Sequence, residues 1–150
     1  MIRTRVLAAP ARDLTRLNAM VTWLEANLAV HNQETWAMSD VDAPAVTIPG
    51  DGEICGTTCC LAGWTLLHDH THYRFNQWRQ AVIHISTGIS VEYSDDFTLR
   101  ARGLLNLTEE EALMLFEYTN TLSQMRRMVT DLQAGVDITA LNYDSIAVTA

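Results

Sequence analysis

Three cysteines and three histidines lie close together near the middle of the chain, and their side chains are the ones that could do chemistry. They are Cys55, Cys59, Cys60, His68, His70 and His72. Zinc selects thiolate sulfur and imidazole nitrogen, so a zinc site is one hypothesis for this segment. Its ligands would be Cys55, Cys60, His68 and His72.

Helix geometry opposes a site spread along one continuous helix. At the rise of an α-helix, Cys60 and His68 would stand about 12 Å apart along the axis, whereas zinc ligands lie about 2 Å from the metal. A shared site therefore needs a break in the helix. His68 and His72 would share a helical face and form a two-ligand half-site. Surface or capping roles are the competing interpretation of the histidines, and we favour those roles.

The cysteines have two further interpretations. Cys59 or Cys60 in the first turn of a helix could be a nucleophile, because the helix dipole favours a thiolate there, but no local signature selects its base among the five histidines. The other role is architectural, since Ala62 and Gly63 let another helix approach closely while Trp64 fills the space beside them. We favour this role, because three cysteines cannot all pair within one chain and thiols in a reducing compartment are usually buried packing groups.

Helices must position this segment. Apolar residues recur at helical spacing from Leu14 to Leu28, which predicts a first helix. A second helix is predicted to begin near Thr57 or Thr58, either of which can cap it, and to run toward the histidines.

Two stretches have β character. Between Trp36 and Cys55, turn residues are flanked by two short β-capable pieces, which predicts a loop or a small hairpin. Residues 81–93 carry β-branched residues on both sides of Thr87-Gly88, which predicts a hairpin with a two-residue turn; a helix is the competing prediction.

The C-terminal half is predicted to be helical. Ser94 or Asp95 can cap a helix that stops before Asn106. Thr108 and Glu111 then form the pattern of a capping box, which predicts the start of the next helix. That helix has a possible break at residues 119–123 and ends at Gly135. Residues 136–150 are predicted to be an irregular tail.

The fold class predicted from these elements is mainly α: a compact bundle of three to five helices with one or two small β-hairpins. With 150 residues and 48% apolar content, the chain is predicted to form one domain over residues 1–150.

Charge and hydropathy exclude some function classes. A net charge of −8 argues against nucleic-acid binding, because a surface that follows phosphates needs clustered cations and the chain has only ten basic residues. No stretch approaches the roughly 20 apolar residues of a membrane span, and none reads as a secretory signal. We therefore expect a cytoplasmic protein without a membrane partner.

The motif from Cys55 to Trp64, Cys-Gly-Thr-x-x-Cys-x-Ala-Gly-Trp, resembles that of a group of small uncharacterised proteins of bacteria, notably actinobacteria, and of their phages. Residues 35–39 resemble the segment that precedes the motif in that group, and residues 101–116 resemble its C-terminal helical part. The resemblance implies a small helical protein encoded by a phage, and it implies no activity. It shifts interest to Cys55 and Cys60 and away from Cys59.

These observations lead to two functional hypotheses. The first is a non-enzymatic protein-interaction module without a cofactor, a phage accessory protein that binds a host or virion protein, because no complete catalytic constellation is present. Self-association is one form that the partner could take. The alternative is a zinc-binding or thiol-dependent protein centred on the Cys55–Cys60 segment.

Overall fold

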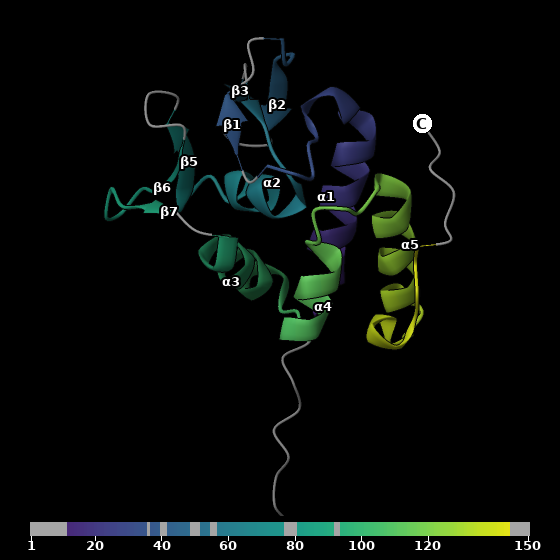
Figure 1. The fold of residues 1–150 in the computed structure, drawn as a ribbon. Helices are drawn as coiled ribbons and strands as arrows, with labels where there is room; N and C mark the ends of the chain where they lie inside the picture. Colours follow the sequence, from purple (N-terminus) through teal and green to yellow (C-terminus); the bar gives the residue numbers. More distant parts are fainter. Residues whose placement is uncertain are drawn as a thin grey trace, which may run out of the picture.

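A computed structural model describes residues 12–35, 37–39, 42–48, 52–54, 57–76, 81–91 and 94–144. This part of the chain contains five α-helices and three small antiparallel sheets (Figure 1). The α-helices are α1 (Leu14–Ala26), α2 (Leu61–His68), α3 (Ser94–Leu105), α4 (Glu109–Leu115) and α5 (Leu122–Gln133). Two short 3₁₀ helices are η1 (Leu28–Val30) and η2 (Ile138–Ala140).

Two helix boundaries predicted in the C-terminal half are confirmed, the end of α3 and the start of α4, whereas the break predicted at residues 119–123 begins earlier, since α4 ends at Leu115 and α5 begins at Leu122. Helix α3 stops at Leu105, and Asn106 follows it with a positive φ of 52°. Thr108 and Glu111 form the capping box of α4: the Glu111 amide donates to Thr108 Oγ1 at 3.2 Å, and the Thr108 amide donates to Glu111 Oε1 at 2.9 Å. Each bond satisfies a backbone N–H that the first helical turn leaves without a partner.

Seven short strands form the three sheets in the described residues. Strand β1 (Met38–Ser39) pairs with β4 (Thr57–Thr58), and β2 (Val46–Ile48) forms a hairpin with β3 (Gly52–Ile54). The third sheet has the order β5 (Tyr73–Asn76), β6 (Ala81–His84) and β7 (Ser90–Val91).

The prediction of a mainly α fold is wrong, because the three sheets make the chain a mixed α/β protein. The strands are two to four residues long, so the alternation that marks a strand in a sequence has little room to show. The hairpin expected in residues 81–93 is present as β6 and β7, but its turn is longer than two residues, since the His84 amide donates to the Ile89 carbonyl at 2.9 Å.

The predicted start of the second helix also needs correction. Thr57 and Thr58 pair in β4 instead of capping a helix, and Cys60 is the N-cap of α2. The pairing of β4 with the distant β1 overrides the local capping preference of threonine, because the sheet pairs the backbone groups of Thr57 and Thr58 themselves.

Helix α2 lies at the centre of the molecule, between α1, α3 and the β5–β6–β7 sheet (Figure 1). Its residues from Leu61 to Leu67 are all buried, and Trp64 Nε1 donates to the Val30 carbonyl at 2.9 Å. Burial on all sides hides the amphipathic period that marks a surface helix. None of the described helices is long and apolar enough to cross a bilayer.

Candidate functional site

The cysteine pair at the start of α2 is held by the backbone of three separate segments. The Cys59 amide donates to the Val30 carbonyl at 3.1 Å, and the Cys60 amide donates to the Thr35 carbonyl at 2.7 Å. Cys60 Sγ accepts a hydrogen bond from the Gly63 amide at 3.4 Å and so serves as the helix cap. The Cys60 thiol is therefore a hydrogen-bond acceptor inside the core.

Burial keeps both thiols protonated. Loss of solvation raises the pKa of Cys60 to about 11, against weaker lowering by the amides at the helix start. Burial, followed by the neighbouring Cys60, raises the pKa of Cys59 further. A nucleophile or zinc ligand needs the thiolate form of cysteine. The cost of burying that negative charge exceeds the stabilisation that the helix dipole gives it, so neither thiol is activated.

His68, the last residue of α2, is fixed by a hydrogen bond and by stacking. Its Nδ1 is 2.8 Å from the Trp64 carbonyl, so Nδ1 carries the proton, and its ring meets the Trp23 ring edge-on with centroids 4.6 Å apart. The other nitrogen, Nε2, is buried without a hydrogen-bond partner in the part of the chain that the structure describes. Burial lowers the pKa of His68, so the ring is neutral with an unpaired acceptor.

The structure does not gather the predicted zinc ligands that it describes. Cys60 and His68 stand at opposite ends of α2, about 12 Å apart by helical rise. The helix ends at His68, and His72 lies beyond it with Nδ1 3.0 Å from the Asp69 carboxylate. Cys55 lies outside the described residues. Within those residues, no three side chains of His, Cys, Asp or Glu are placed to hold one metal ion.

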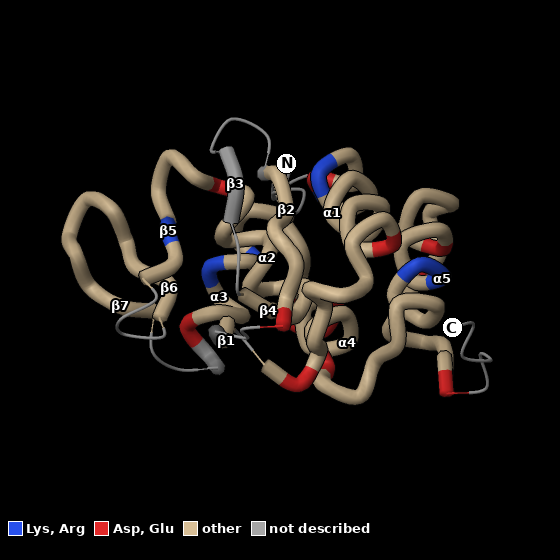
Figure 2. Tube along the Cα trace, turned by 90° about the horizontal axis from the view of Figure 1, so that it is seen from above, with Lys and Arg blue, Asp and Glu red and all other residues tan. Residues whose placement is uncertain are grey.

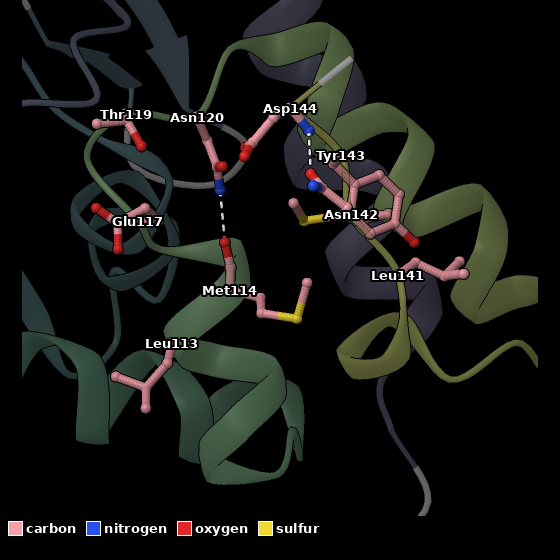
Figure 3. Close-up of a pocket in the computed structure, with 10 residues that line it drawn as sticks. Leu113, Met114, Glu117, Thr119, Asn120, Leu141, Asn142, Tyr143 and Asp144 are labelled. Atoms are coloured by element: carbon pink, nitrogen blue, oxygen red, sulfur yellow. Dashed lines mark hydrogen bonds between the residues drawn. The ribbon is translucent and has the colours of Figure 1, made fainter. Parts of the chain in front are cut away.

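A groove between α4 and α5 is the other candidate site, and its volume is about 400 Å³. We call it the α4–α5 groove. Its lining includes Leu113, Met114, Met128, Leu141, Glu117 and Asp144. Figure 3 shows Thr119, Asn120 and Asp144 along one edge and the apolar Leu113 and Met114 along the opposite edge. A hollow that combines apolar side chains with polar groups in this way is typical of ligand and peptide sites.

The walls of the groove are held in place by specific bonds. Asn120 Nδ2 donates to the Met114 carbonyl at 2.6 Å and to the Leu115 carbonyl at 3.1 Å, which caps the C-terminal end of α4. On the other wall, Tyr143 has its hydroxyl 2.7 Å from Asp131 Oδ2 and its carbonyl bonded to Gln124 Nε2 at 3.1 Å. The groove is therefore a fixed feature of α4, α5 and the segment after η2.

Buried Gln33 joins this region to the start of α2. Its Nε2 donates to the Glu117 carbonyl at 3.2 Å, and its Oε1 accepts from the Leu61 amide at 3.2 Å. The start of α2, where the cysteine motif lies, is thus linked through Gln33 to the connection between α4 and α5. The thiols of Cys59 and Cys60 do not line the groove.

Two apolar side chains of the groove are exposed, whereas Met128 is buried. Leu113 is 59% exposed and Leu141 is 44% exposed, although both are large aliphatic residues. The sequence carries a signal for this exposure, because Ala112 to Leu115 are four successive apolar residues and one face of a helix cannot bury all four. This excess of apolar residues in α4 was therefore a usable signal for an exposed side chain. The position of residues 141–144 at the groove could not be predicted from residue spacing.

A second hollow, of about 540 Å³, lies between the end of α3 and the start of α4. Three of its charged side chains have partners: Arg12 Nε is 2.6 Å from Glu111 Oε2, and Arg102 Nε donates to the Leu107 carbonyl at 3.0 Å. Glu109 and Glu110 also line this hollow.

No protein-family model, curated protein or solved structure matches the chain.

Proposed function

We propose that this protein is a non-enzymatic protein-interaction module that binds an apolar segment of another protein in the α4–α5 groove. The observation that supports this proposal is the exposure of Leu113 and Leu141 at a hollow with fixed walls. Covering such side chains on binding gains about 25 cal/mol for each Å² removed from water. Met114 and Met128 suit this role, because methionine adapts its shape to different apolar partners.

The charge distribution agrees with a protein partner better than with a nucleic acid. The arginines of the described residues lie on separate elements, α1, β5, α3 and α5, and on the segment before α1 (Figure 2). The chain as a whole carries a net charge of −8. The cytoplasm as its place of action, and a host or virion protein as its partner, belong to this proposal through the resemblance of the cysteine motif to phage proteins.

A selection from displayed random 12-residue peptides tests the proposal. Peptides enriched on the wild-type protein should no longer bind the Leu113→Asp variant. They should bind the Ile89→Asp variant as tightly as the wild type. Ile89 is 67% exposed in the turn between β6 and β7, so both variants place the same charge at an exposed apolar position. Peptides that bind Leu113→Asp as well as the wild type, or a selection without enrichment, would contradict the proposal.

Metal binding through His68 is a second candidate, favoured by the buried Nε2 that lacks a partner in the described part of the chain. The bond from Nδ1 to a carbonyl fixes the tautomer and orientation in which histidine binds a metal. Titration with cobalt(II), followed by its visible spectrum, tests this role. A saturable spectrum that disappears in His68→Phe would support it, and identical spectra for the two proteins would exclude it.

A further inference from the structure

Two carboxylates stand at the α4–α5 groove. Glu117 and Asp144 are both exposed, and neither has an ion-pair partner among the described residues. No arginine of the described residues lines the groove. The site therefore combines apolar and neutral polar side chains with two carboxylates at its rim.

None of the described arginines pairs with a carboxylate at this rim. The sequence contains no lysine, and its ten Lys or Arg positions are all arginines. Five described arginines pair with other carboxylates, in the pairs Arg12–Glu111, Arg16–Asp13, Arg100–Asp96, Arg126–Glu25 and Arg127–Asp131. Neither Glu117 nor Asp144 is among these partners.

We infer that the occupant of the α4–α5 groove is a short segment of a partner protein that combines an apolar anchor with lysine or arginine. The anchor packs between Leu113, Met114 and Met128, and the cationic groups face Glu117 and Asp144. Charge complementarity of this kind gives specificity and faster association more than it gives affinity. This inference rests on the proposed function and names the chemistry of its partner.

Two other occupants fit the charges less well. A second copy of the chain would bring a negative rim against a negative rim, and each copy carries a net charge of −8. The segment Ser145–Ala150, which follows Asp144 directly, contains no basic side chain to complement the groove.

The peptide selection described above gives the first test, when the composition of the enriched peptides is read. Peptides that bind in a Leu113-dependent way should be enriched in lysine and arginine and depleted in aspartate and glutamate relative to the input library. Groove-dependent peptides without that bias would overturn this inference and leave the proposed function standing. Absence of any groove-dependent peptide would overturn both.

A double variant, Glu117→Gln with Asp144→Asn, tests the rim directly. Both side chains are exposed, so the fold tolerates the change. It should weaken the binding of a selected basic peptide by about 2- to 10-fold, the range expected for two exposed charge pairs. A matched variant, Glu109→Gln with Glu110→Gln on α4, should leave that affinity unchanged. Equal affinity of the rim variant and the wild type would overturn the inference.

Zero-length carbodiimide coupling then locates the partner's lysine. Because the chain lacks lysine side chains, an amide formed between a carboxylate of this protein and the lysine amine of a selected peptide marks the contact. Mass spectrometry should place the cross-link at Glu117 or Asp144. Cross-links confined to other carboxylates would overturn the inference.

The oligomeric state of the protein and the affinity of a truncated chain distinguish the two remaining occupants. A dimer that Leu113→Asp converts to a monomer would overturn the inference in favour of a second copy. A chain ending at Asp144 that binds the peptide much more tightly than the full chain would overturn it in favour of the segment Ser145–Ala150. We expect a monomer and equal affinity.

Discussion

At the scale of single residues, burial decides what the cysteine–histidine segment does. A thiol at a helix start is a nucleophile only when water and nearby cations support its charge. Cys60 instead accepts a hydrogen bond from the Gly63 amide inside the core, and burial raises its pKa to about 11. The same burial gives His68 a neutral ring packed against Trp23. The segment therefore acts through packing and capping.

The buried thiols predict slow chemical modification. In a Cys55→Ser variant, Cys59 and Cys60 should not react with Ellman's reagent at pH 8 within minutes, because their thiolates are scarce and enclosed. Both should react at once in guanidinium chloride. Release of one or two equivalents of thiol product from the native variant would contradict the burial of this pair.

The histidines predict a pH dependence of stability. Burial lowers the pKa of His68 and of His31 below 6.5, so the unfolded chain binds protons more readily than the folded chain. The free energy of unfolding should therefore be constant above about pH 7 and fall as the pH drops below about 6.5, by at most about 1.4 kcal/mol per pH unit for each histidine.

Urea titrations between pH 7.5 and 5.5 measure this effect. The double variant His31→Gln with His68→Phe should lose most of the slope, whatever its absolute stability, because neither replacement titrates. An unchanged slope would show that other groups cause the pH dependence.

The site itself was only partly predictable at this scale. The sequence favoured a buried packing role for the cysteines, but it could not show what encloses Cys59 and Cys60, because that depends on contacts with the distant Val30 and Thr35. The exposure of Leu113 depends in the same way on how α4 packs against its neighbours. Reactivity and exposure are properties of the assembled fold.

At the scale of elements, the short helix α4 sets the shape of the groove. Seven residues are too few for a helix to be stable alone, so its ends must be held. The Thr108–Glu111 capping box holds the N-terminal end, and Asn120 holds the C-terminal end through the Met114 and Leu115 carbonyls. The groove depends on both.

Replacing Asn120 by Asp should therefore destabilise the protein. The change removes two donated hydrogen bonds and places a negative charge beside carbonyl oxygens at the negative end of α4, which should cost about 1–3 kcal/mol. Asn142→Asp is the matched control at the same groove, because its Oδ1 accepts from the Asp144 amide and an aspartate retains that bond. The control should change the free energy of unfolding by less than about 0.5 kcal/mol.

Chemical denaturation of the two variants measures the difference. Equal stability of Asn120→Asp and Asn142→Asp would show that the cap of α4 contributes nothing. Loss of peptide binding in Asn120→Asp beyond that in the control would show that the cap also shapes the groove.

Helices were predictable where their signals are local, and sheets were predictable only where a local hairpin signal exists. The capping box at Thr108 needs only four successive residues, so the sequence predicts it correctly. The hairpin of β6 and β7 has such a signal, but β1 pairs with β4 across the nineteen residues between Met38 and Thr58. Such pairings come from tertiary contacts, and short strands carry little periodicity of their own.

At the scale of the whole molecule, the cysteine motif and the groove are parts of one arrangement. The motif begins α2, which the other elements surround, and Gln33 connects the start of α2 to the Glu117 carbonyl at the groove. An acidic chain without lysine thus presents a fixed hollow that combines apolar and polar side chains, with two carboxylates that have no ion-pair partner among the described residues. The ligand that we propose for this surface is a basic–apolar segment of another protein.

Methyl spectra of the protein labelled with ¹³C at its methionine methyl groups test binding at the groove most directly. Adding a peptide from the selection should shift the resonances of Met114 and Met128, which line the groove. The resonances of Met38, exposed in β1, and of Met20, buried in α1, should stay in place. Shifts at Met38 without shifts at Met114 and Met128, or no shift at saturating peptide, would contradict the assignment of the α4–α5 groove as the binding site.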